Sequence, residues 1–130
     1  MKKLVLGIAV LIFSILPAMS LENLNFKYGY ISDNAKVITQ DDYAGITAII
    51  KELQEKTTAE IAVVTVKSLQ GQSIERTATE IGRKYKVGAA DKNNGVVILV
   101  APNERKARLE VGMGLESEIT NPKADSIMNT

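Results

Sequence analysis

The pattern of apolar and polar positions predicts two amphipathic helices. In residues 40–56, apolar side chains from Tyr43 onward recur at helical spacing, and most charged residues fall on the other face. Thr39 begins a capping box, which is typical of a helix start. Residues 73–86 carry a second apolar stripe, and Gly88 is well placed to end that helix.

The strands predicted between these helices are short and rich in β-branched residues. Runs at 61–66 and 96–101 are almost continuously apolar, as expected for strands covered on both faces. With a helix between them, they form a right-handed unit of two parallel strands. Alternating aromatic residues near the start favour another strand over about 27–31, followed by a turn over 32–34.

The last part of the chain adds a hairpin and a helix. Residues 106–111 alternate strictly between polar and apolar, and the tight turn before them makes this strand antiparallel to the preceding one. Asn121 is then expected to cap a short helix, with Pro122 in its first turn. The order β-α-β-α-β-β-α predicts an α/β fold, a three-layer sandwich on a mixed sheet of about four strands.

The first twenty residues have the layout of a secretory signal peptide. Lys2 and Lys3 precede an uncharged apolar run over 4–16, which Pro17 ends, and small residues then lead to a cleavage site after Ser20. A transmembrane anchor is the alternative, but the apolar run is shorter than the roughly 20 residues that span a bilayer. We therefore expect an exported, periplasmic or extracellular domain over 21–130.

Composition excludes several kinds of chemistry. The chain has no Cys and no His, so it can form no disulfide, no zinc-thiolate site and no triad built on an imidazole. Its 16 Lys and Arg nearly balance its 15 Asp and Glu, which argues against nucleic acid as a partner. Carboxylates, hydroxyls, cationic side chains or a hard metal ion remain available for function.

Polar groups converge at the open end of the predicted hairpin. The loop before its first strand, 91–95, and the loop after its second, 112–116, should lie side by side. Oxygen-rich loops of this kind suit Ca²⁺ or Mg²⁺. The alternative is that these are ordinary turn residues. The predicted metal ligands are Asp91, Asn93, Asn94 and Glu116.

One face of the last strand carries Lys106, Arg108 and Glu110. Arg108, with Arg105 from the turn, could hold a carboxylate or a phosphate, because a guanidinium donates two parallel hydrogen bonds. The simpler interpretation is an edge strand protected by charge.

Four segments in order resemble the TPM domain family, which is named for thylakoid-lumen, photosystem II repair and levamisole-receptor modulator proteins. They read YISDNA, AEIAVVTV, NGVVILVA and RKARLEVGMGLE. The resemblance implies an α/β sandwich in a secreted or lumenal domain, often tethered by a later transmembrane segment. It also implies links to photosystem repair, receptor modulation, an acid phosphatase activity and calcium binding.

The resemblance carries over to particular positions, with departures. Asn93 stands where the family usually has an aspartate, and Thr58 stands where a helix-ending glycine is usual. The chain also ends inside the C-terminal helical region of the family, so we expect the last helix to be incomplete. The positions that match the functional residues of the family are Asp33, Asn93, Asn94, Arg105, Arg108, Glu110 and Glu116.

Two functions from different classes follow. The first is a non-enzymatic module that binds an envelope or membrane protein complex and supports its assembly. The second is a Ca²⁺- or Mg²⁺-assisted phosphomonoesterase, in which Asp33 is nucleophile or general base and Arg105 or Arg108 neutralises phosphate charge. The first is preferred, because His and Cys are absent and Asn93 removes a carboxylate from the predicted metal site.

Overall fold

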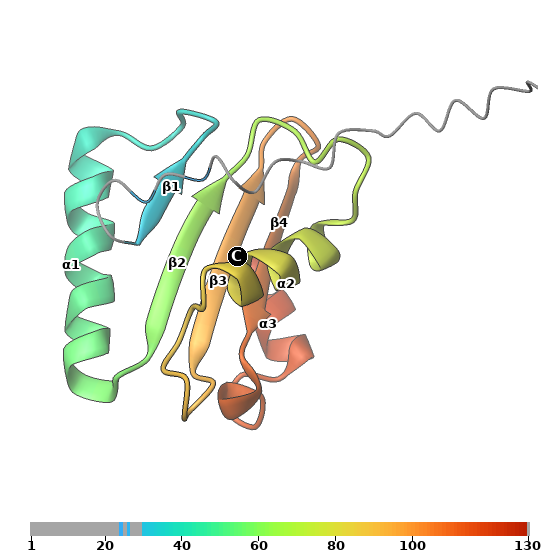
Figure 1. The fold of residues 1–130 in the computed structure, drawn as a ribbon. Coiled ribbons are helices and arrows are strands. Elements are labelled where there is room, and N and C mark those ends of the chain that lie inside the picture. The colour runs from blue at the N-terminus through green and yellow to red at the C-terminus, as the bar shows by residue number, and fades with distance from the viewer. Residues whose placement is uncertain (1–23, 25, 27–29, 130) are drawn as a thin grey trace, which may run out of the picture.

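A mixed four-stranded sheet with the strand order β1-β2-β3-β4 forms the centre of the fold (Figure 1). The computed structural model describes residues 24, 26 and 30–129. β1, β2 and β3 are parallel, and β4 is antiparallel to β3. This confirms the predicted α/β fold. The strands are β1 (Ile31–Asp33), β2 (Glu60–Thr65), β3 (Gly95–Ala101) and β4 (Lys106–Val111).

Helices cover both faces of the sheet, because neighbouring residues of a strand point to opposite faces. On β2, Val64 belongs to the core cluster under α2, whereas Val63 belongs to the core cluster under α1. α3 packs on the same face as α1, where Ala124 meets Val96 and Leu109. Figure 1 shows α2 in front of the sheet and α3 behind it. The helices are α1 (Gln40–Thr57), α2 (Ile74–Lys84) and α3 (Asn121–Met128).

The start of α1 agrees with the prediction from the sequence, whereas the end of α2 and the cap of α3 differ from it. Thr39 caps α1 as predicted. The structure ends α2 at Lys84, so the prediction that it runs to 86 and stops at Gly88 is wrong. Gly88 instead adopts φ +104 in the following loop, where its backbone lies against Gly95. Thr120 rather than Asn121 caps α3, because its hydroxyl accepts a hydrogen bond from a backbone N–H of the first turn.

The first strand lies later in the chain than the pattern predicted. β1 includes Ser32 and Asp33, which were expected to form a turn, and residues 27–29 lie outside the described part of the chain. Both polar side chains find partners inside the fold: the Asn34 amide donates to Ser32 Oγ and the Thr65 hydroxyl donates to Asp33. These bonds let polar residues occupy a strand position, which local composition alone does not reveal.

The predicted signal peptide, residues 1–20, lies outside the described part of the chain. Among the residues that the structure describes, no helix combines the length and the apolar character needed to cross a bilayer.

Candidate functional site

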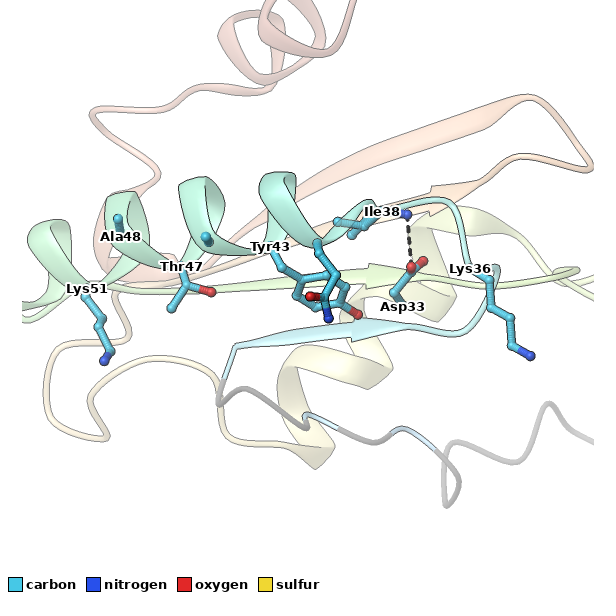
Figure 2. A pocket seen from close by; sticks show the side chains of 9 residues that line it. Asp33, Lys36, Ile38, Tyr43, Thr47, Ala48 and Lys51 are labelled. Carbon is cyan, nitrogen blue, oxygen red and sulfur yellow. Dashed lines mark hydrogen bonds between the residues drawn. The ribbon is translucent and has the colours of Figure 1, made fainter.

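An open pocket of about 950 Å³ lies beside the carboxyl end of β1 and along α1 (Figure 2). In open α/β sheets, ligands bind most often beyond the carboxyl ends of the parallel strands. One end of the pocket, formed by Asp33, Lys36 and Ile38, therefore lies at the carboxyl end of the parallel strands, and the rest runs along α1. Its lining residues are Asp33, Lys36, Ile38, Gln40, Tyr43, Ala44, Thr47, Ala48 and Lys51.

The helix sequence explains why this side of α1 is hollow. Ile50 is buried in the core, with Ile46 packed partly buried against the same cluster. The neighbouring stripe carries the small side chains of Ala44, Thr47 and Ala48, which line the pocket. Residues three and four apart share one helix face, so these small side chains leave a continuous trough along the helix.

Asp33 holds the loop at the mouth of the pocket together. Its carboxylate accepts hydrogen bonds from the backbone N–H groups of Val37 at 3.1 Å and Ile38 at 2.9 Å. The Thr65 hydroxyl donates a third at 2.5 Å. Partial burial by itself raises the pKa of Asp33, but the hydrogen bonds from Thr65 and the loop backbone outweigh burial and bring that pKa below its ordinary value.

This arrangement makes Asp33 an ionised clamp for the loop between β1 and α1. To attack a substrate, this carboxylate would have to give up hydrogen bonds that hold the loop in place. The predicted catalytic role of Asp33 remains a prediction, and its geometry favours a positioning role.

Two lysines give the pocket its charge. Figure 2 shows Lys36 and Lys51 toward opposite ends of the row of side chains, with Tyr43 between them. Within the described residues, neither lysine takes part in an ion pair. The Asp33 carboxylate is engaged by internal donors and stays charged, so the pocket lining combines two lysines and one carboxylate with small and apolar side chains.

The opposite end of the sheet carries the loops that were predicted to bind a metal. The Gly112 N–H donates to the Gly95 carbonyl at 2.7 Å, and the Gly114 N–H donates to the Asn93 carbonyl at 3.0 Å. A Cβ added at Gly114 would lie 1.9 Å from the Lys92 carbonyl oxygen. The structure therefore confirms that the two loops meet, and they meet through backbone contacts too close for a side chain.

Asn94 serves this junction as a structural clamp. The residue is only 6% exposed. Its Oδ1 accepts from the Ala89 N–H at 2.9 Å, and its Nδ2 donates to the Thr58 hydroxyl at 3.1 Å. Both polar atoms are thus engaged, so Asn94 fits a metal ligand poorly.

The other predicted ligands are exposed. Asp91, Asn93 and Glu116 are oxygen donors of the kind that Ca²⁺ accepts. In the part of the chain that the structure describes, no three acidic, His or Cys side chains are grouped closely enough to hold a metal ion. The fit to a metal is therefore partial, and Ca²⁺ or Mg²⁺ binding stays a prediction.

The two predicted arginines lie along the hairpin. Arg105 is exposed in the turn between β3 and β4, at the same end of the sheet as Asp33. Arg108 donates from Nε at 3.2 Å and from Nη2 at 3.1 Å to the same oxygen of Glu110. This pairing partly neutralises the guanidinium that was expected to hold an anion.

The predicted catalytic and metal-binding residues do not form one centre. Asp33 and Arg105 lie at the carboxyl end of the parallel strands, whereas Asp91 and Glu116 lie at the amino end of β3. A strand rises about 3.3 Å per residue, so the length of β3 separates the two ends by roughly 20 Å. A metal held by one group could not assist a reaction at the other.

Several residues of these two regions were missed by the sequence analysis. Thr65 interrupts the apolar run over 61–66, and that polar position was the only available signal of its bond to Asp33. Glu104, whose carboxylate accepts the Leu69 N–H at 3.1 Å, ties the loop before α2 to the hairpin turn. Nothing in the sequence distinguishes Lys36 or Lys51 from other exposed lysines.

Comparison with known proteins gives a family and a fold. The TPM domain model matches residues 31–130. The solution structure of the N-terminal domain of a protein from P. gingivalis aligns with TM-score 0.70 and 23% identity, over 76% of this chain and 63% of that one. The N-terminal domain of the cg2496 protein from Corynebacterium glutamicum aligns with TM-score 0.61 and 21% identity, over 78% of this chain and 64% of that one.

The chain thus spans a little under two-thirds of each of these two structures. At such identities, the likeness establishes the fold alone. No match was found among curated proteins.

Proposed function

Because this chain belongs to the TPM domain family, we propose that it is a binding module that holds a segment of an envelope or membrane protein complex. The positively charged pocket between the β1 end and α1 carries the proposal. It combines two lysines that form no ion pair among the described residues with small and apolar side chains, and its one carboxylate is engaged by internal hydrogen bonds.

The length of the pocket along α1 indicates what kind of segment fits. Gln40 and Lys51 both line the pocket, and a helix of that length rises about 16 Å. One small anion cannot bridge such a distance. An extended peptide covers it with about five residues, at about 3.3 Å each. The expected ligand is therefore an extended segment with acidic side chains near both ends and apolar residues between them.

The cellular setting comes from the sequence. The predicted signal peptide, residues 1–20, would export the chain, so the partner is sought among proteins of the cell envelope. No part of this binding function needs His, Cys or a cofactor.

The phosphatase alternative has less support. It needs Asp33, an arginine and a metal held by Asp91 and Glu116 to act together, and the sheet separates these groups. When bound, Ca²⁺ or Mg²⁺ would supply charge neutralisation for a phosphate. Turnover of a phosphate ester by pure protein that is lost in both Asp33→Ala and Glu116→Ala would favour this alternative over the binding module.

A defined peptide tests the binding proposal. The probe is a fluorescein-labelled peptide, Asp-Val-Thr-Val-Thr-Glu, and its control replaces both acidic residues with lysine. We expect saturable fluorescence anisotropy for the acidic peptide alone, weakened about fivefold in the Lys36→Gln/Lys51→Gln variant, because each exposed ion pair contributes up to about 1 kcal/mol.

Lys56→Gln is the matched control, because Lys56 lies on the same helix but pairs with Glu52. Equal binding by wild type and the double variant would contradict the proposed site. So would equal binding of the acidic and the basic peptide.

A further inference from the structure

The outer edge of β4 carries backbone groups without a partner among the described residues. The Gly112 N–H bonds to the Gly95 carbonyl directly opposite. Because such pairs alternate along an antiparallel ladder, the backbone groups of every second residue from Gly112 face β3. The N–H and C=O groups of the residues between them face away from the sheet: Ala107, Leu109 and Val111.

Open space runs along this edge. A hollow of about 290 Å³ is lined by Lys106 and Ala107 together with the end of α3, and a hollow of about 310 Å³ is lined by Glu110 and Val111 together with residues 119–121. β4 is the last strand of the sheet, so nothing in the described part of the chain continues the ladder. An edge of this kind pairs readily with another strand unless charge opposes the pairing.

The charges on β4 favour one strand in particular, a second copy of β4 running antiparallel. With Leu109 facing Leu109 of the second copy, Ala107 faces Val111, so that all outward-facing backbone groups meet. The same register puts Arg108 directly opposite Glu110 of the second copy, twice. Opposite charges that face each other across strands are stabilising.

Neighbouring registers are opposed by the same side chains. A slip by two residues one way places Arg108 opposite its own counterpart, although Lys106 then faces Glu110, and a slip the other way places Glu110 opposite its own counterpart. Like charges directly opposite are destabilising. Slips by one residue would move the apolar side chains to the wrong face. The register centred on Leu109 is therefore favoured, because it contains two Arg108–Glu110 pairs and no pair of like charges.

We propose that two copies of this chain associate through their β4 edges, antiparallel about a twofold axis at Leu109, to form one continuous sheet. Arg108 and Glu110, with side chains 24% and 26% exposed, keep their pairing within each chain and add one across the interface. The antiparallel arrangement also keeps the basic Arg105–Lys106 end of one strand away from that of the other. This inference is independent of the proposed peptide pocket, which lies at the opposite edge of the sheet.

Sedimentation equilibrium of the purified protein and two charge variants tests the inference. Wild type is expected to form a concentration-dependent dimer. Arg108→Glu and Glu110→Arg alone each place like charges across the axis, so each should dimerise at least tenfold more weakly. Mixed one to one, these two variants present opposite charges at both positions and should regain association.

Ala107→Pro gives a second test that leaves the charges intact. It removes an outward N–H and leaves the hydrogen bonds to β3 in place, so it should also weaken the dimer. Circular dichroism checks that each variant is folded. A monomer at millimolar concentration overturns the proposal, as does a dimer that is unaffected by both charge variants. Binding of a different protein along this edge by a wild type that stays monomeric overturns it as well.

Discussion

Polar side chains hold loops in place at both ends of the sheet, but only the carboxyl end of β1 also has a large open pocket beside them. At the amino end of β3, both polar side-chain atoms of Asn94 form hydrogen bonds, one within its own loop and one to Thr58 at the end of α1. At the carboxyl end of β1, Asp33 also holds its own loop, but beside it lies an open pocket with two lysines that form no ion pair in the described part of the chain. A cluster of Asp, Asn and Gly is therefore weaker evidence of a site than a hollow with unsatisfied charge.

The largest effect expected is at the amino-end loop junction. Gly114→Ala should lower the free energy of unfolding by about 3 kcal/mol, because its Cβ would meet the Lys92 carbonyl oxygen at 1.9 Å. Urea unfolding followed by circular dichroism measures the loss. Gly45→Ala is the control, since Gly45 lies in α1 with nothing within 4 Å of an added Cβ. That change should stabilise the protein by up to about 1 kcal/mol. Equal effects at both glycines would contradict the close backbone contact.

A smaller loss is expected at the carboxyl end. Asp33→Ala removes the acceptor of three hydrogen bonds and should lower the free energy of unfolding by about 2 kcal/mol. Thermal unfolding of wild type and variant gives the difference. If the variant lost no stability but lost phosphatase turnover, Asp33 would be catalytic rather than a loop clamp.

The ionisation of Asp33 adds a pH dependence to the same residue. Its pKa in the folded protein lies below the ordinary value of 3.8, so its contribution is complete above that value and is lost as pH falls through the folded pKa. Wild type should therefore lose more stability than Asp33→Asn between pH 5 and pH 2. Parallel pH profiles for the two proteins would exclude a lowered pKa at Asp33.

Loss of the Asn94 hydrogen bonds should lower the free energy of unfolding by less than Gly114→Ala or Asp33→Ala. Asn94→Ala leaves the partly buried Ala89 N–H without its acceptor and should lower the free energy of unfolding by about 1 kcal/mol. Asp91→Ala, on the exposed part of the same loop, should change it by less than 0.5 kcal/mol, about the usual effect of a surface substitution. Chemical denaturation of the two variants and wild type measures these changes in the free energy of unfolding. A larger loss for Asp91→Ala would mean that this loop carries an interaction, such as a bound ion, that the hydrogen bonds do not explain.

The smallest effect on stability is expected at the pocket. Lys36→Gln/Lys51→Gln should leave the melting temperature within about 1–2 °C of wild type, because neither lysine takes part in an ion pair among the described residues. Differential scanning calorimetry checks it. A substantial loss of stability would show that these lysines serve the fold, and the comparison between the two ends would fail.

The sequence predicted most of the architecture, because long-range packing left clear periodic signals. The buried runs of β2 and β3 and the helical stripe of α1 are visible without coordinates. β1 was misplaced because Ser32 and Asp33 have turn-forming side chains, and Thr65, whose hydroxyl bonds to Asp33, lies 32 residues away in the chain. Tertiary hydrogen bonds of that range have no local signature.

The candidate site could be predicted only in part. The meeting of loops 91–95 and 112–116 followed from hairpin topology and is confirmed. The engagement of Asn94 by Thr58 was not foreseeable, because it joins the end of α1 to a loop 36 residues later. The pocket along α1 depends on how the β1–α1 loop folds back, which Asp33 determines through backbone bonds.

The most direct test of the central claim is a two-dimensional NMR titration of the protein with the acidic peptide and, separately, with Ca²⁺. The claim predicts saturable peptide-induced shifts between Lys36 and Lys51, with the resonances of Asp91–Gly95 and Gly112–Glu116 unchanged by the peptide. Saturable Ca²⁺ shifts in those two loops, together with no peptide shift along α1, would contradict it. The function would then lie at the amino end of the sheet.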